Sequence, residues 1–407
     1  MSNPKCPFPT GIALTALDPT FREQPHEHLD HLREIEPVHQ DREFDRVVLT
    51  RADDISAVLN DRTLGKDPRK SRPGSFSRVQ LGVDENFQPS LLHMDDPDHK
   101  RLRDLVSKAF NQRSVDAMGP RISEIAKRLL HEIAQPSRFD VIEEYAKPLP
   151  TLVIAEMLGV DGPDQKDFKR WSDAQTHMFN PSRTDEQLAS LKWGREALSS
   201  YFAEAVSKRR KNRGTDLIST LIAAEEEGQQ LSEREIISTC HLLLFAGNVT
   251  TTDLIGNGVL ALLRHPDELA KLRKQPELAR KAVEEVLRYD SPVAETKRET
   301  TKSMQIDGVT IAAGQTIVSS LLAANYDPSV HTNPHKFDIE RTDNRHHSFG
   351  GGAHFCLGAP LARAEAQIAL PLIFARFPKL RLMSGHTPLR KSLPNFNGLE
   401  SLWVDTN

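Results

Sequence analysis

Residues 349–358 combine a run of glycines, a single cysteine and the start of a helical pattern. Three consecutive glycines let the backbone fold tightly, because residues without a Cβ can take positive φ and can approach a flat ligand or a sulfur closely. After Cys356, apolar residues recur at helical spacing from Leu357 to Phe377. The stretch therefore predicts a cysteine at the N-terminus of a helix, where the dipole and free N–H groups favour a thiolate.

A thiolate in this position suits a soft or borderline metal such as haem iron, so we predict that Cys356 is a metal ligand. Two alternatives stay open on these residues alone. A lone cysteine beside a glycine-rich turn is often a small buried hydrophobe. Zinc is the other alternative, because three histidines lie close to the cysteine in sequence: His346, His347 and His354. Zinc sites normally use paired short spacings separated by a longer loop, a pattern that is absent here.

Composition limits the class of protein. The chain has 407 residues, 38% hydrophobic and 27% charged, which is enough to bury a large core, and its net charge is −4. It has no basic arm, so nucleic-acid binding is not expected. Cys6, Cys240 and Cys356 are too few and too scattered for a disulfide framework, which favours a reducing compartment.

The sequence does not indicate membrane attachment. Residues 1–17 contain several prolines and no continuous apolar run, so we expect neither a signal peptide nor an anchor. The longest apolar-rich segment, residues 241–263, is interrupted by polar side chains: Asn248, Thr250, Asp253 and Asn257. Such interruptions argue against a transmembrane helix. The expectation is therefore a cytoplasmic protein.

The remaining pattern predicts a mainly helical chain with short β segments. The longest predicted helix begins at Ser232, which forms a Ser-x-x-Glu capping box with Glu235, and it runs to about Arg264. Residues 64–88 lack periodicity and predict a long loop, either functional or disordered. Other predicted helices cover 28–35, a segment from 53 or 54 onward, 99–110, 115–133, 149–158, 164–179 and 186–210; a hairpin covers 38–50, and strands cover 309–311, 316–322 and 380–383.

The glycine-rich stretch resembles the haem-binding signature of the cytochrome P450 family, Phe-Gly-x-Gly-x-His/Arg-x-Cys-x-Gly. It matches at every fixed position: Phe349, Gly350, Gly352, His354, Cys356 and Gly358. The resemblance extends from about residue 20 to the end of the chain. It implies a mainly α fold with small β-sheets, in which an extension (1–20) precedes a single prism-shaped domain (21–407). Haem b would lie between the long central helix and the helix after Cys356.

The resemblance also implies residues that hold the haem. His99 and Arg103 are spaced i, i+4, so they share a helix face that is either solvated or able to clamp an acid. By resemblance they bind a haem propionate, and so does Arg298. The remaining implied haem contacts are Ala246, Phe349, Gly350, His354 and Gly358. A buried structural group is implied for Glu285, Arg288 and Arg341.

The centre of the long helix, residues 246–251, resembles the family pattern Ala/Gly-Gly-x-Asp/Glu-Thr-Thr, except that Val249 replaces the acid. From the residues alone, this segment can open the helix or simply bond a threonine to the preceding turn. By resemblance, Thr250 and Thr251 are catalytic. Asp253 can replace the missing acid if its side chain turns inward. Implied substrate contacts are Phe87, Leu92, Leu242, Phe245, Val249, Val293, Ala294 and Phe396.

The function implied by the resemblance is that of a haem-thiolate monooxygenase. Such an enzyme uses two electrons and O₂ to insert an oxygen atom into a small to medium hydrophobic substrate. No Gly-x-Gly-x-x-Gly follows a strand in a βαβ context, so electrons are expected from a separate ferredoxin and its NAD(P)H-dependent reductase. A hydrogen-peroxide-dependent peroxygenase and a non-catalytic haem sensor remain as alternatives, because Val249 departs from the family pattern.

Overall fold

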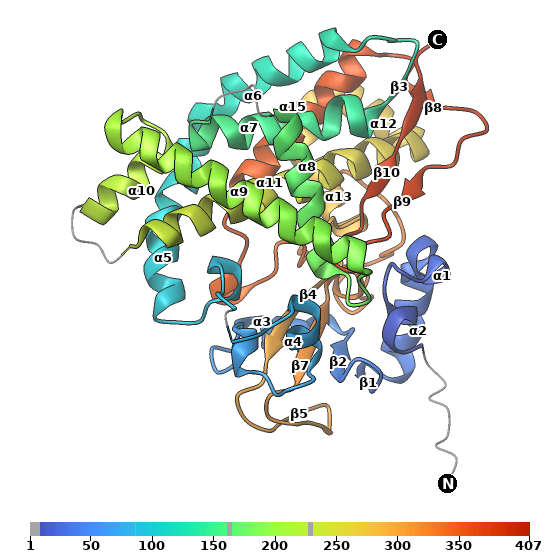
Figure 1. Ribbon diagram of the computed structural model, residues 1–407. Helices are drawn as coiled ribbons and strands as arrows, with labels where there is room; N and C mark the ends of the chain where they lie inside the picture. Colours follow the sequence, from blue (N-terminus) through green and yellow to red (C-terminus); the bar gives the residue numbers. More distant parts are fainter. Residues whose placement is uncertain (1–8, 86, 161–164, 227–230) are drawn as a thin grey trace.

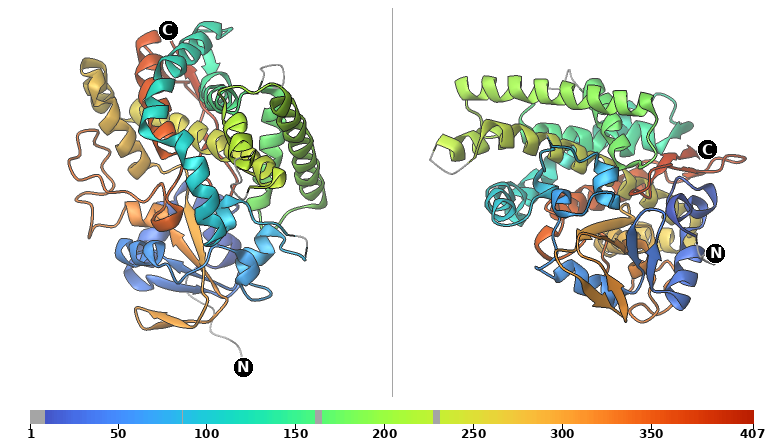
Figure 2. Two further views of the ribbon diagram at one scale, coloured as in Figure 1. Left: turned by 90° about the vertical axis from the view of Figure 1, so that its left-hand side faces the viewer. Right: turned by 60° about the horizontal axis from the view of Figure 1, so that its bottom comes forward.

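The computed structural model describes residues 9–85, 87–160, 165–226 and 231–407. A large helical part and a smaller part built around a sheet lie against each other (Figure 1). Two further views show the helices stacked in layers on one side and the sheet on the other (Figure 2). The predicted fold class, mainly α with small sheets, is confirmed.

Most helices belong to the large part. They are α5 (Asp98–Val106), α6 (Gln112–Glu132), α7 (Pro148–Leu158), α8 (Gln165–Thr176), α9 (Asp185–Lys211), α10 (Leu217–Glu226), α11 (Glu233–Arg264), α12 (Pro266–Lys274), α13 (Ala279–Tyr289) and α15 (Ala359–Arg376). The helices near the sheet are α1 (Pro19–Glu23), α2 (Pro25–Ile35), α3 (Ala52–Asn60), α4 (Phe76–Leu81) and α14 (Leu321–Asn325).

The main sheet has the strand order β1-β2-β7-β4. Its strands are β1 (Val38–Asp41), β2 (Arg46–Leu49), β7 (Thr316–Ser320) and β4 (Glu295–Glu299). β1 and β2 form the predicted hairpin, β2 runs parallel to β7, and β4 runs antiparallel to β7. The smaller sheets are β3 (Arg138–Asp140) with β11 (Trp403–Asp405) and β8 (Arg381–Leu382), β9 (Leu389–Arg390) with β10 (Leu399–Ser401), and β5 (Met304–Ile306) with β6 (Val309–Ile311).

Helix α11 runs through the helical part and contacts α7, α9 and α15. Its first turn carries the predicted capping box: the Ser232 hydroxyl accepts from the Glu235 N–H at 3.3 Å, and the Glu235 carboxylate accepts from the Ser232 N–H at 2.8 Å. Every residue from Thr251 to Leu262 is buried. A helix that is buried on all sides in this way is a central element of a large core.

Some predicted boundaries are wrong. The expected loop over 64–88 contains α4 and a 3₁₀ turn at Pro68–Lys70, because helices this short show no periodicity. The strand expected over 316–322 ends at Ser320, whose hydroxyl caps α14. The expected division at residue 20 stays a prediction, although Gly11 N–H already donates to the Asp41 carboxylate at 2.9 Å.

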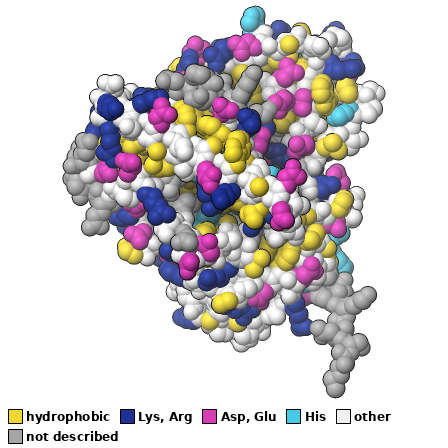
Figure 3. Space-filling view, viewed as in Figure 1, with side chains coloured by type: hydrophobic (Ala, Val, Ile, Leu, Met, Phe, Trp, Pro, Cys, Tyr) yellow, Lys and Arg dark blue, Asp and Glu magenta, His cyan; other side chains and the backbone are white. Residues whose placement is uncertain are grey.

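Within the described ranges, no helix combines the length and apolar character needed to cross a bilayer. The surface in Figure 3 shows acidic and basic side chains interspersed, with hydrophobic groups between them. This mixture agrees with the small net charge of −4. It presents no broad face of a single charge sign on the side shown.

Candidate active site

A cavity of about 320 Å³ lies where the two parts of the fold meet. Helices α11 and α15, the cysteine loop, strand β4 and helix α4 all contribute side chains to its lining. A volume of this size is typical of small-molecule sites. The cavity is therefore the candidate active site.

The cysteine loop is folded as its glycines predict. Gly350 and Gly352 have φ of 69° and 64°, a left-handed conformation that favours glycine. At Gly352 a Cβ would lie 2.1 Å from the Leu59 carbonyl oxygen at the end of α3, so no larger residue fits there. The Cys356 N–H donates to the Phe349 carbonyl at 2.9 Å and closes the loop.

Cys356 lines the cavity immediately before α15, and its side chain is exposed to that cavity. The protein that surrounds the cavity separates the thiol from bulk water, and this desolvation raises its pKa above the ordinary value. Two influences oppose the rise: the N–H groups of Gly358 and Ala359 hydrogen-bond the sulfur, and the nearby Arg103 favours the thiolate. A desolvated thiol that is offered N–H donors suits coordination of a metal, which replaces the proton.

The predicted haem contacts gather around the same cavity. The residues that line it are His99, Arg103, Ala246, Phe349, Gly350, His354, Cys356 and Gly358. The His99 and His354 rings lie 4.0 Å apart, and burial lowers the pKa of both imidazoles. Arg298 lies behind the lining, where its guanidinium donates to the Leu59 and Gly351 carbonyls at 3.2 Å each.

These side chains fit a flat group that carries carboxylates. His99 Nε2 is buried and has no hydrogen-bond partner. In the described part of the chain, no acidic side chain forms an ion pair with Arg103 or Arg298. Desolvated cations without anions are costly, and carboxylates would relieve that cost. Haem b, with a metal for Cys356 and two propionates for the cations, matches this set of donors.

The zinc alternative has no comparable geometry. The described residues contain no cluster of three or more histidine, cysteine or acidic side chains that could hold a metal ion. His346 is bonded to Glu284 at 3.1 Å, and His354 packs against His99. His346 and His354 therefore have other partners.

The centre of α11 supplies the opposite wall. The Thr250 hydroxyl donates to the Ala246 carbonyl one turn earlier at 2.9 Å, and the helix is unbroken there. Thr250 and Thr251 both line the cavity. Asp253 does not: its buried carboxylate accepts from Lys391 at 2.6 Å, close to Gly398. The inward turn required for Asp253 to donate protons at the cavity is not observed.

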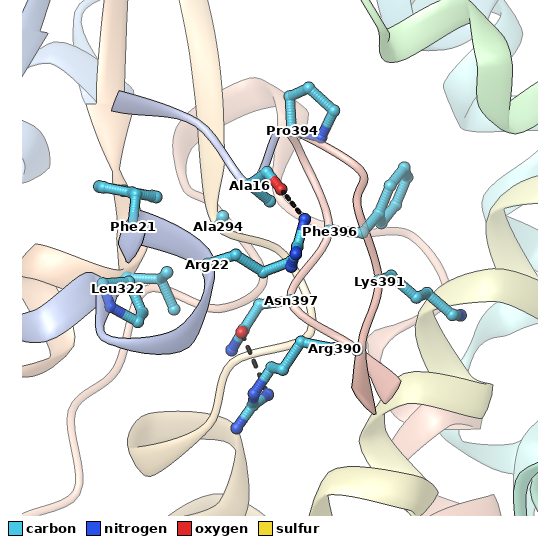
Figure 4. A pocket seen from close by; sticks show the side chains of 12 residues that line it. Ala16, Phe21, Arg22, Ala294, Leu322, Arg390, Lys391, Pro394, Phe396 and Asn397 are labelled. Atoms are coloured by element: carbon cyan, nitrogen blue, oxygen red, sulfur yellow. Dashed lines mark hydrogen bonds between the residues drawn. The ribbon is translucent and has the colours of Figure 1, made fainter. Parts of the chain in front are cut away.

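The predicted substrate contacts divide into two groups. Those that line the cavity are Leu92, Leu242, Phe245, Val293 and Phe396. Val249 instead packs in an apolar cluster with Phe179, Phe245 and Phe396, which we call the aromatic cluster. Ala294 lines a separate cavity of about 20 Å³ beside Arg22 and Phe396 (Figure 4). Phe87 lines neither.

The three residues predicted to form a buried structural group, Glu285, Arg288 and Arg341, do contact one another and lie outside the cavity lining. Arg288 is fully buried and donates to Glu285 at 2.8 and 2.9 Å, while Arg341 contacts the same carboxylate at 3.2 Å. Arg288 also donates to the Asn325, Pro334 and Lys336 carbonyls. The trio thus ties α13 to the long segment that leads into the cysteine loop.

Several polar cavity residues were not anticipated from the sequence. They are Lys66, Gln80, His93, Thr296, Lys297, Glu365 and Asn395. Lys66 and Gln80 lie in the segment expected to be a loop, so no periodicity indicated which way they face. Strand β4 is polar at every position, so alternation gave no signal there either.

Comparison with known proteins agrees with this site. The family profile described as Cytochrome P450 matches residues 20–396. Cytochrome P450 107B1 of Saccharopolyspora erythraea is 40% identical over 401 residues, covering 96% of this chain and 97% of that protein. The vitamin D(3) 25-hydroxylase of Pseudonocardia autotrophica is 39% identical, covering 90% and 89%. The myxobacterial cytochrome P450 CYP267B1, solved with myristic acid, has a TM-score of 0.90 at 36% identity, covering 96% and 98%.

The chain belongs to the cytochrome P450 family. Members of this family bind haem b, and the named relatives include monooxygenases and hydroxylases of bacteria. The protein is accordingly a cytochrome P450 monooxygenase. The cavity described above holds residues that fit haem b: a cysteine for the iron, and histidines and an arginine for the carboxylates.

Proposed function

We propose that this enzyme inserts one atom of O₂ into a small to medium hydrophobic substrate, with electrons from a separate ferredoxin and its NAD(P)H-dependent reductase. The observation that carries the proposal is the position of Cys356. Its closed loop presents the sulfur to a cavity that is also lined by Phe245 and Phe396 of the aromatic cluster.

Haem b, when bound, supplies the activation of O₂ and the oxidising power. Cys356 would ligate the iron, and the N–H groups of Gly358 and Ala359 would hold the sulfur in place. His99, Arg103 and His354 are positioned to bind carboxylates. Arg298, which bonds the Gly351 carbonyl, would both bind a carboxylate and hold the cysteine loop against α3.

Thr250 is the residue best placed to position a proton. Its hydroxyl hydrogen is used by the Ala246 carbonyl, so its oxygen lone pairs are available to accept from a water in the cavity. Val249 cannot exchange protons, and Asp253 is held by Lys391. We propose that protons reach Thr250 through water in the cavity.

The aromatic cluster would orient the substrate. Phe179 and Phe396 meet edge to face with ring centroids 5.0 Å apart, and Phe245 stacks on Phe179 at 5.9 Å. Apolar surface of this kind favours a hydrophobic molecule without selecting one polar group. One relative is named as a vitamin D(3) 25-hydroxylase, and another was solved with myristic acid. Both support a hydrophobic substrate class.

We also propose that the enzyme acts in the cytoplasm. The two described cysteines, Cys240 and Cys356, are both free thiols, which suits a reducing compartment. Cys240 is buried in α11 and does not line the cavity.

The proposal is tested by loading the protein with haem and recording the spectrum of its reduced carbon monoxide complex. A strongly red-shifted Soret band is expected for thiolate ligation. Turnover of a hydrophobic probe such as myristic acid is then compared with ferredoxin, reductase and NADPH against hydrogen peroxide alone. Product formed only with peroxide would indicate a peroxygenase, and ligand binding without turnover of any probe would favour a sensor.

A further inference from the structure

Lys66 is a cavity residue to which no role has been given so far. It lies between α3 and the turn at Pro68–Lys70, and its backbone is fixed on both sides. Gly65 and Glu299 exchange two backbone hydrogen bonds of 2.8 Å, and the Lys66 N–H donates to the Asp95 carboxylate at 2.6 Å. The lysine is therefore held against strand β4, and its side chain reaches the cavity.

The Lys66 ammonium has only neutral partners. Nζ donates to the Thr296 hydroxyl and to the Lys297 carbonyl, each at 3.0 Å. Across the described ranges, no carboxylate pairs with this ammonium, and the Asp95 side chain is bonded to Lys70 at 2.8 Å instead. An ammonium has three donors, so one remains for a further acceptor. Burial holds the pKa of Lys66 well below its ordinary value.

The strongest charge effects on Lys66 come from cations, and Glu299 and Asp95 oppose them only in part. Arg298 and Lys297 are its nearest cationic neighbours and disfavour its charged form. Lys66 likewise lowers the pKa of His354 and of His93, both of which line the cavity. Several desolvated cations around one cavity, with fewer acids facing them, would be stabilised in their charged form by an anion bound among them.

The position of Lys66 indicates which anion this is. Its partner Thr296 is two residues from Arg298 on β4, so the two side chains project from the same face of the strand. Arg298 in turn donates to Gly351 in the cysteine loop. Lys66 is thus on the side of the cavity that carries the cysteine loop. Phe179 and Phe396 belong to the aromatic cluster on the other side.

We propose that Lys66 binds a propionate of the haem, as an anchor additional to His99, Arg103, Arg298 and His354. The inference rests on the haem-binding role of the proposed function. It assigns the free donor of the ammonium to a carboxylate oxygen, while Thr296 and the Lys297 carbonyl fix its direction. The residue would contribute to retention of the cofactor rather than to the oxidation itself.

The test measures the rate at which the protein loses haem to an excess of apomyoglobin. Lys66→Met removes the charge and keeps most of the stem, Lys66→Gln is a second neutral variant, and Lys66→Arg keeps the charge. Lys70→Met is the matched control, because Lys70 is an exposed neighbour outside the cavity. The two neutral variants at Lys66 should lose haem at least about tenfold faster, a difference of about 1.4 kcal/mol. Lys66→Arg and Lys70→Met should remain near the wild-type rate.

A second arm uses haem dimethyl ester, whose propionates carry no charge. Wild type and Lys66→Met should lose this ester at equal rates, because the interaction is already absent. An equal acceleration with haem and with its ester would overturn the proposal and assign Lys66 to packing. Unchanged haem loss, with weaker binding of myristic acid but not of its methyl ester, would also overturn it and assign Lys66 to a substrate carboxylate.

The wild-type protein separates this inference from the function on which it rests. If wild type takes up no haem, or binds it without thiolate ligation, the proposed function fails. If wild type binds haem through Cys356 and the Lys66 variants retain it as well as wild type does, only the inference about Lys66 fails.

Discussion

The two sides of the cavity are built in different ways. On the cysteine side, the loop of Cys356 and the trio of Glu285, Arg288 and Arg341 are held by hydrogen bonds and ion pairs with fixed directions. On the other side, the side chains of the aromatic cluster meet one another through apolar contacts. Apolar contacts are not directional, so side chains of similar size can replace one another.

This difference predicts separate roles for the two sides of the cavity. A hydrogen-bonded site depends on particular residue types at particular positions, whereas an apolar wall depends mainly on volume. We therefore expect the cysteine side to determine cofactor binding and the aromatic side to determine substrate binding. Substitutions on the cysteine side should therefore change haem ligation or stability, whereas substitutions on the aromatic side should change the affinity for substrate.

Cys356→Ala should have the largest effect. It removes the only side chain in the loop that can ligate iron as a thiolate, so the red-shifted band of the reduced carbon monoxide complex should disappear, together with monooxygenase turnover. The measurement is the difference spectrum, normalised to haem content. Cys240→Ala is the control, because Cys240 lies outside the cavity, and it should keep the band. A band that persists in the Cys356 variant would contradict the assignment.

Arg288→Ala should cause the next largest loss. The substitution leaves the fully buried Glu285 without its closest cation, and breaking a buried pair in this way costs about 3–5 kcal/mol. Denaturant unfolding of the haem-free protein measures this loss. The exposed pair of Arg345 with Asp343 supplies the control, and Arg345→Ala should leave the midpoint unchanged. Equal midpoints for wild type and Arg288→Ala would show that the trio does not stabilise the fold.

Phe396→Ala tests the opposite side. Phe396 lines the cavity and contacts Phe179, so its removal should weaken binding of a hydrophobic probe by roughly 1–2 kcal/mol, about 5- to 30-fold. Haem content should remain that of wild type. Titration of the Soret band with myristic acid gives the affinity. Phe87→Ala is the matched control, because Phe87 does not line the cavity. If both phenylalanine variants lost the same affinity for the probe, Phe396 would contact the substrate no more than Phe87 does, and its position in the cavity lining would not explain binding.

Thr250→Ala should alter the fate of electrons more than the binding of either ligand. Without the hydroxyl, a water near α11 loses the residue that positions it, so a several-fold larger share of NADPH should end as hydrogen peroxide. Thr250→Ser keeps the hydroxyl and should stay near wild type. Peroxide and product are measured per NADPH consumed. Unchanged coupling in the alanine variant would remove Thr250 from the proton path.

The effect expected for Lys297, a charge near the aromatic side, appears only at alkaline pH. Burial lowers the pKa of its ammonium to about 8, below the unfolded value of 10.5. Between these values the unfolded chain binds more protons, so the protein should gain stability as pH rises from about 8 towards 10.5. Lys297→Met should lack that gain. Thermal unfolding of both proteins across this pH range provides the comparison. If the stability of wild type and of Lys297→Met changed with pH in the same way, the pKa of Lys297 would not be lowered in the folded protein.

The same contrast explains how much the sequence could predict. Long helices such as α11 and the glycine loop of Cys356 follow from periodicity, capping and backbone sterics, all of which are local. Helix α4 is too short to be periodic, so its contribution to the cavity could not be foreseen. The direction of Asp253 depends on its contact with Lys391, which lies far away in the chain, and local patterns hold no information on such a partner.

The contact between Gly352 and the end of α3 has a consequence for the order of events in the cell. Leu59 leaves the ribosome well before Gly352, and at about 5–20 residues per second the two are separated by roughly 15–60 s. During that interval the cysteine loop, which packs against the end of α3, has not yet been synthesised. Acquisition of the cofactor therefore has to wait until the cysteine loop has been made, and a chain that stops before Cys356 would lack the iron ligand even with most of its helices formed.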